Sequence, residues 1–226
     1  MPLLRTQMLD GGSLGKVAAL HRRIIESLED RSFLYHRGID FFERLIVSDG
    51  AIVGVFSDSD ELIAYAALAA PGSTFSGRPQ GLGRLGIDPA RVAFGAGCGV
   101  HPDHRGTGLM KPIVEERERR AAALGADFVT GVVAPHNTAS LTTFHKLGYA
   151  AVGIHHDDDG ENYLLLKSIV AQLPPASAAK LEIGLSDHET NFAILRDGRL
   201  IGLPLQRIAE AVFAYVEPGE LFAASP

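Results

Sequence analysis

One stretch, residues 92–111, restricts the possible folds of this chain more than any other. A run of apolar and small residues from Val92 to Val100 stops near Pro102, and a loop containing Gly106 and Gly108 follows. An amphipathic helical pattern begins directly after that loop. The order predicts a buried strand, a tight loop and a helix whose first turn faces the loop.

The junction between the loop and the helix is suited to bind an anion. The first turn of a helix presents unpaired N–H groups and the positive end of the helix dipole. Glycines let a phosphate approach the backbone closely, and Pro112 lies in the first turn, where its missing N–H matters little. No Gly-Lys-Ser/Thr sequence ends the loop, so the pattern does not indicate a nucleoside triphosphate site.

The loop also resembles a family motif. Arg105-x-x-Gly108-x-Met110 is similar to the Arg/Gln-x-x-Gly-x-Gly/Ala loop of the GNAT superfamily of N-acetyltransferases, which holds the pyrophosphate of acetyl-CoA. Met110 departs from the motif, because the family usually has a small residue there. Backbone N–H groups bind the phosphate, so the Met110 side chain need not prevent binding.

A second motif lies downstream at the spacing that the family has. Asn137 opens a segment similar to the family's Asn-x-x-Ala/Ser followed by an aromatic residue, Lys-Leu-Gly and Phe/Tyr, here Phe144, Lys146-Leu147-Gly148 and Tyr149. The resemblance covers about residues 1–168. It implies an α/β fold, the GNAT acyl-CoA N-acyltransferase fold, in which a mixed but mostly antiparallel central sheet is flanked by helices.

The resemblance implies acetyl-CoA as a co-substrate and assigns residues to it. The central strand would hydrogen-bond the pantetheine arm, the glycine loop would hold the pyrophosphate, and the second motif would add further contacts. The predicted cofactor-binding residues are Cys98, Gly99, Val100, Arg105, Gly106, Thr107, Gly108, Leu109, Met110, Lys111, Asn137 and Phe144.

The residues that would exchange protons depart from the family. Many members have a tyrosine as general acid where this chain has Phe144, and some have a glutamate where it has Val132. Titratable groups near these positions in the sequence are the candidates to replace them. Tyr149 and His101 are the predicted catalytic residues, with His145 and His136 as alternatives.

The predicted reaction is the direct attack of an amine on the thioester within a ternary complex. A base or a desolvated pocket must supply the neutral amine, and the resemblance places N–H donors for the thioester oxygen around Cys98 to Val100. The acceptor would be a primary amine of a small molecule or peptide. The alternative is an inactive GNAT-fold module that binds acyl-CoA as a sensor or structural element. The Cys98 thiol is interpreted as a small buried strand residue rather than a nucleophile.

A glycine-rich segment, Pro71 to Pro89, carries a competing motif. Gly81 to Gly86 matches the dinucleotide fingerprint, which would predict a nicotinamide enzyme, but no helix pattern follows it. We expect this long loop to form part of the acceptor pocket. His36 and Arg37, between the first two helices, are further predicted acceptor contacts.

Periodicity and turn residues predict the remaining elements. Ser13 is the expected N-cap of the first helix, His21 a packed histidine on its apolar stripe, and Asp40 with Glu43 a capping box. The predicted helices are Ser13 to Glu29, Asp40 to Val47, Leu109 to Leu124 and Asn137 to Leu147. The predicted strands are Ala51 to Phe56, Leu62 to Ala70, Val92 to Val100, Asp127 to Val133, Ala150 to Ile154 and Tyr163 to Lys167.

Residues 169–226 are predicted to be a linker and an extension. A linker is expected at Leu173 to Ala179, a hairpin around Asp197-Gly198, and a helix at Pro204 to Tyr215. We expect the extension to pack on the main domain or on a second copy of the chain, in a stabilising or homodimerising role.

Composition restricts partners and compartment. The net charge of −6 gives no electrostatic case for nucleic acid or an anionic membrane, and no apolar run approaches the ~20 residues of a membrane span. The single cysteine and the lack of a basic-then-apolar N-terminal pattern predict a cytoplasmic location. No metal is predicted, because the ligands in His155 to Asp159 are consecutive and form a polar turn.

Overall fold

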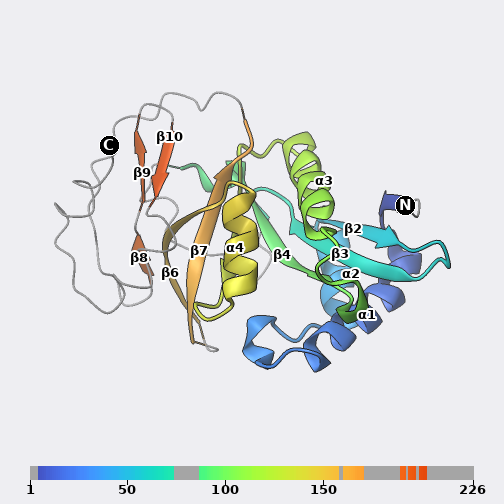
Figure 1. Ribbon diagram of the computed structural model, residues 1–226. Coiled ribbons are helices and arrows are strands. Elements are labelled where there is room, and N and C mark those ends of the chain that lie inside the picture. Colours follow the sequence, from blue (N-terminus) through green and yellow to red (C-terminus); the bar gives the residue numbers. More distant parts are fainter. Residues whose placement is uncertain are drawn as a thin grey trace. The chain divides into compact units, whose positions relative to one another are not determined.

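The computed structural model describes residues 5–73, 87–157, 160–170, 189–191, 193–196 and 199–202 (Figure 1). The chain divides into two compact units. The first contains residues 1–78 and 89–130, and the second contains residues 79–88 and 131–226. No helix in the described ranges is long and apolar enough to cross a membrane.

The first unit is built on a mostly antiparallel sheet. Its strands, in order of pairing, are β1 (Arg5–Met8), β2 (Ala51–Phe56), β3 (Leu62–Ala69), β4 (Val92–Val100) and β5 (Phe128–Val133), the last continuing into the second unit. All neighbours pair antiparallel except β4 and β5, which are parallel. Every residue of β2 and β3 is buried, which explains their continuous apolar sequences.

Helices flank this sheet. They are α1 (Leu14–Glu26), α2 (Ile39–Val47) and α3 (Met110–Ala123), with short 3-10 helices η1 (Gly11–Ser13), η2 (Arg31–Phe33), η4 (Pro89–Arg91) and η5 (Pro102–His104). Helix α1 packs against α2 and β3, whereas α3 packs against β2 and β3 (Figure 1). The mixed α/β class with a mostly antiparallel, helix-flanked sheet is the predicted one, and the prediction is confirmed.

A buried histidine lies within the apolar core of this unit. His21 of α1 is 1% exposed, and its ring packs edge-on against Phe42 of α2 and Tyr65 of β3. Its Nδ1 lies 2.6 Å from the Tyr65 hydroxyl, and its Nε2 lies 2.9 Å from the carbonyl oxygen of Tyr35. Burial lowers the pKa of His21 to about 4, although the bond to Tyr35 opposes that shift. The predicted packed histidine is confirmed.

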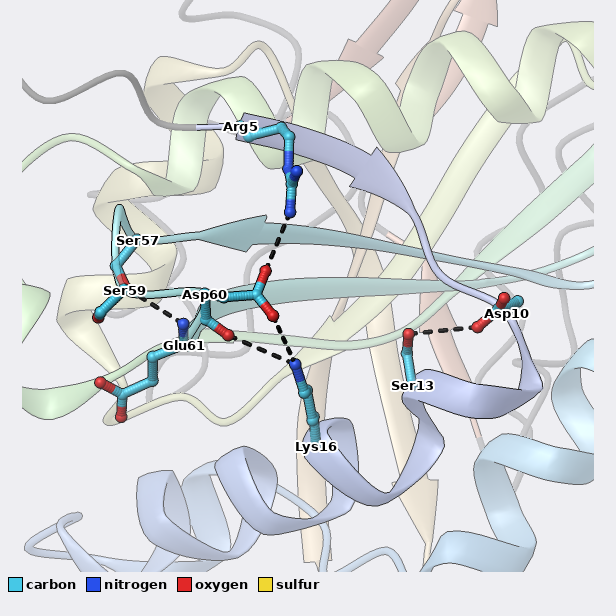
Figure 2. Close-up of polar contacts among 8 residues, drawn as sticks. All are labelled: Arg5, Asp10, Ser13, Lys16, Ser57, Ser59, Asp60 and Glu61. Atoms are coloured by element: carbon cyan, nitrogen blue, oxygen red, sulfur yellow. Dashed lines mark hydrogen bonds and ion pairs between the residues drawn. The ribbon is translucent and has the colours of Figure 1, made fainter.

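An exposed charge cluster joins β1, α1 and the turn between β2 and β3 (Figure 2). The Asp60 carboxylate forms salt bridges with Arg5 of β1 at 3.0 Å and with Lys16 of α1 at 3.1 Å. Both cations also lie over the ring of Phe56. The two positively charged side chains lower the pKa of Asp60, and Lys16 has the larger effect. The cluster ties the edge strand β1, which sequence analysis did not predict, to its neighbours.

One predicted helix cap is confirmed in position and the other is wrong. Ser13 is the N-cap residue of α1, but its hydroxyl makes no capping bond and donates instead to Asp10 at 3.3 Å (Figure 2). Helix α2 begins at Ile39 with Gly38 as N-cap, so Asp40 lies in the first turn and forms no capping box. An acidic residue there still favours the helix dipole.

The second unit contains α4 (Thr138–Lys146), β6 (Ala150–Asp157), β7 (Gly160–Ser168), β8 (Glu189–Asn191), β9 (Ala193–Arg196) and β10 (Arg199–Gly202). Strand β6 pairs antiparallel with β7 and with β8, an unpredicted strand that joins the extension to this sheet. Pairing of Arg196 with Arg199 confirms the predicted hairpin. His155 lies in β6, so the polar turn predicted to begin there is wrong in extent.

Other predictions fall outside the described residues. These are the segment Gly81 to Gly86, the linker Leu173 to Ala179 and the helix Pro204 to Tyr215. The boundary near residue 168 between a main domain and an extension stays a prediction.

Leu45→Ala should destabilise the first unit. Leu45 of α2 is fully buried, and its truncation leaves a cavity expected to cost about 2–5 kcal/mol. Val47→Ala is the matched control on the same helix, because Val47 is 84% exposed. Urea unfolding monitored by circular dichroism measures both variants. Equal losses would show that Leu45 does not pack in the core.

The free energy of unfolding should decrease as the pH is lowered, because His21 is buried in its neutral form. The pKa of His21 is 6.5 when unfolded and about 4 when folded, so the unfolded chain binds the extra proton between these values. The stabilisation is complete above pH 6.5 and is lost as pH falls toward 4. Between pH 7 and pH 5 the free energy of unfolding should fall by about 2 kcal/mol more in the wild type than in His21→Asn, as measured by urea unfolding. Parallel pH dependence in both proteins would contradict a buried neutral His21.

Candidate active site

The loop between β4 and α3 requires glycine for its backbone. Gly106 has φ of 75° and Gly108 has φ of 82°, values that side-chain-bearing residues rarely adopt. A Cβ at either position would meet no atom within 4 Å. The glycines therefore serve the backbone conformation, and the space beside the loop is open for a ligand.

The first turn of α3 faces this loop with unpaired donors. Helix α3 contains 14 residues and has no acidic residue in its first turn. Leu109, which precedes it, is buried and anchors the junction, whereas Lys111 is exposed and lies 3.8 Å from Glu115. The helix dipole, the N–H groups and the lysine together favour an anion.

Arg105 connects the loop to the end of α1. Its guanidinium donates to the Ser27 hydroxyl at 2.6 Å, and Arg23 of α1 lies 3.8 Å from Asp103 of η5. Thr107 donates its hydroxyl to the carbonyl of His104 at 2.6 Å, closing the loop on itself. The bond to Ser27 therefore holds the Arg105 side chain at the end of α1, and the chain continues from Arg105 directly into the glycine loop.

His101, one of the two predicted catalytic residues, shapes the turn that leads into the loop. It is 3% exposed, and its Nδ1 accepts the backbone N–H of Asp103 at 3.2 Å, which caps η5. The other ring nitrogen lies 3.9 Å from a carboxylate oxygen of Glu61. The structure thus assigns His101 a structural contact, and its catalytic role stays a prediction.

Strand β4 carries a bulge in its middle. Ala66 pairs with Cys98 and Leu68 with Gly95, so two residues of β4, Ala96 and Gly97, oppose one residue of β3. Gly97 has φ of 113°, a conformation that favours glycine.

The bulge changes which face of the sheet the small residues of β4 address. A Cβ on Gly95 would meet Arg117 of α3, whereas one on Gly99, four residues later, would meet Ile24 of α1. Positions four apart in a regular strand share a face, so the inserted residue reverses the alternation. In the described ranges the ladder with β5 ends at Phe94, while the ladder with β3 continues to Val100.

Cys98, the cysteine beyond the bulge, is half-buried. Desolvation raises the pKa of its thiol, and the nearby Arg117 guanidinium opposes that rise only in part. Thiolate is the nucleophilic form, so this environment favours the interpretation of Cys98 as a packing residue. Its backbone, with those of Gly99 and Val100, runs along the pairing with β3.

Three predicted site residues belong to the second unit. Asn137 is the N-cap of α4, where its side-chain oxygen accepts the Ser140 N–H at 3.1 Å. The rings of Phe144 and Tyr149 pack edge to face with centroids 5.1 Å apart. Tyr149 is 3% exposed and lies beneath the Lys167 ammonium. The motif residues therefore organise the two ends of α4.

Sequence reasoning missed Tyr65. It lies in an otherwise apolar run, and a single tyrosine there gave no signal beyond a strand residue. Its partner His21 was recognised only as packed. In the described part of the chain no cluster of three or more His, Cys, Asp or Glu is arranged to hold a metal ion.

Comparison with known proteins identifies the fold. The structure of a protein from Salmonella typhimurium, determined with its cofactor acetyl-CoA, aligns with this chain with a TM-score of 0.57 at 13% sequence identity. The alignment covers 77% of this chain and 98% of the Salmonella protein. The phosphinothricin acetyltransferase of Sinorhizobium meliloti, in complex with acetyl-CoA, gives 0.57 at 16% identity, over 81% and 96%. The ribosomal-protein-S18-alanine N-acetyltransferase of Escherichia coli gives 0.56 at 13%, over 74% and 94%.

Sequence comparison gives the family. No curated protein matches the chain significantly. The model of the acetyltransferase (GNAT) family matches residues 19–149, which include both motifs and more than half of the 226 residues. The chain therefore belongs to the GNAT acetyltransferase family.

Proposed function

We propose that this protein is an N-acetyltransferase that transfers the acetyl group of acetyl-CoA to a primary amine of a small molecule or peptide. The main support is the loop after β4, where Gly106 and Gly108 adopt positive φ beside open space and precede a helix without acidic residues in its first turn. Two structural neighbours were determined with acetyl-CoA.

The chain's own residues divide the work of binding. The pyrophosphate of acetyl-CoA would accept hydrogen bonds from the N–H groups of Gly106 to Lys111 and would be attracted by the charge of Arg105. Asn137 and Phe144 are further proposed contacts of the cofactor. The pantetheine arm would lie along the backbone of Cys98, Gly99 and Val100. Because pyrophosphate and thioester are at opposite ends of that arm, a pyrophosphate at the loop leaves the thioester nearer the bulge end of β4.

In the reaction, the neutral amine attacks the thioester carbonyl carbon, the C–S bond breaks, and CoA leaves as thiolate or thiol. Backbone N–H groups of β4 would stabilise the charge that develops on the carbonyl oxygen. The amine's proton passes to a base or to solvent, and the departing thiolate takes a proton from an acid or from solvent. His101 and Tyr149 are our candidates for the groups that exchange these protons. The cytoplasmic location is part of the proposal and rests on the single cysteine.

Calorimetric titration with acetyl-CoA and with free CoA should show binding that depends on the loop. Arg105→Glu reverses a charge beside the phosphate site, and Gly108→Trp forces a bulky residue into a left-handed conformation. Each variant should bind both ligands at least tenfold more weakly, a loss of about 1.4 kcal/mol in binding free energy. Arg22→Glu, on an exposed position of α1, is the charge-matched control and should bind normally.

Several outcomes would contradict this. Wild-type protein that binds neither ligand would refute the cofactor site, and unchanged binding in both loop variants would place it elsewhere. An amine panel then tests turnover. Binding without turnover of any amine would support the alternative, an acyl-CoA-binding module, which the presence of Phe144 and Val132 at the family's acid and base positions favours.

A further inference from the structure

A line of polar contacts runs from the segment before α2 to Tyr65 of β3, whose hydroxyl lies beside the bulge of β4. His21 lies at its centre, 2.6 Å from the Tyr65 hydroxyl through Nδ1. Through Nε2 it lies 2.9 Å from the Tyr35 carbonyl oxygen and 3.1 Å from the Arg37 backbone nitrogen. All of these groups belong to the first unit.

The ring of His21 has a matched partner in either neutral tautomer. With the proton on Nε2, it donates to the Tyr35 carbonyl and accepts from the Tyr65 hydroxyl. With the proton on Nδ1, it accepts the Arg37 N–H and donates to the Tyr65 oxygen. Because burial keeps the ring neutral, the Tyr65 oxygen stays hydrogen-bonded in both cases. Its position is therefore fixed from the side of α1.

The other side of the Tyr65 hydroxyl meets the bulge. A Cβ placed on Gly97 would lie 3.5 Å from that oxygen, which is ordinary contact distance. Tyr65 is fully buried, so its hydroxyl acts on the backbone that lies against it rather than on solvent. Among the described residues the hydrogen bond of this hydroxyl is to His21, and its contact toward Gly97 is one of packing.

We propose that Tyr65, locked by His21, is a positioning residue for acyl transfer that holds the β4 bulge at Ala96 and Gly97 in the shape that receives the acyl end of acetyl-CoA. This rests on the proposed function, in which the thioester lies at the bulge end of β4. The contacts to Tyr35 and Arg37 also couple the bulge to the segment between α1 and α2. An acceptor that moves this segment would thereby alter the backbone at the acyl site.

The test compares affinities for acetyl-CoA and free CoA, which differ only at the acyl end. Wild-type protein should prefer acetyl-CoA. Tyr65→Phe removes one oxygen and keeps the ring, so it should retain CoA binding while the preference falls threefold or more. A merely structural loss would weaken both ligands alike and leave their ratio unchanged. Tyr163→Phe, which removes a hydroxyl from a buried tyrosine of β7, is the matched control.

His21→Asn provides a second, independent variant. The amide oxygen can take the place of Nδ1 as acceptor for Tyr65, but the link to Tyr35 and Arg37 is lost. We expect CoA binding to be kept and the preference for acetyl-CoA to fall less than in Tyr65→Phe. If Tyr65→Phe does not fold, this variant carries the test, with a lowered preference as the supporting result.

Three outcomes would overturn the inference. Equal affinity of the wild type for acetyl-CoA and CoA would show that the bulge contributes nothing to the acyl end. An unchanged preference in the folded variants would show that Tyr65 and His21 do not position it. Loss of preference in Tyr163→Phe as well would show a general effect. Failure of the wild type to bind CoA at all would instead refute the proposed function.

Discussion

The structure of the first unit depends on the backbone of β4. A single extra residue at the bulge reverses the side-chain alternation. Gly95, before the bulge, therefore faces α3, and Gly99, after it, faces α1. At Gly95 and Gly99 a larger residue would require side chains of these helices to move. A Cβ on Gly95 would come within 2.8 Å of Arg117, and one on Gly99 within 2.7 Å of Ile24. The glycines of β4 thus allow close packing against side chains of both helices.

Polar groups inside this core are arranged to limit the cost of burial. His21 and Tyr65 satisfy one another, and burial keeps the histidine neutral near pH 7. A neutral hydrogen-bonded pair avoids the desolvation penalty of a buried charge while fixing the geometry of α1 against β3. Such directional contacts specify one packing arrangement where apolar contacts alone tolerate several.

The conformation of the glycine loop has a different physical origin from the close packing around β4. Neither Gly106 nor Gly108 has a neighbour that a side chain would touch, so their φ values alone require glycine. Arg105 is held by Ser27 at the end of α1, and the first turn of α3 has no carboxylate to oppose an anion. Membership of the GNAT family explains why this combination of loop, cation and helix terminus occurs where it does.

The sequence by itself determined the elements whose signal is local. The apolar runs Ala51–Phe56 and Val92–Val100 have the predicted bounds, and the paired glycines with the Asn137 motif indicated the family. Local patterns failed where a distant partner decides the outcome. Strand β1 has little apolar character and exists because β2 pairs with it. The bulge, the cap formed by His101 and the contact of His21 with Tyr65 were decided only by tertiary structure, because each joins groups whose proximity depends on strand register and helix packing rather than on neighbouring residues.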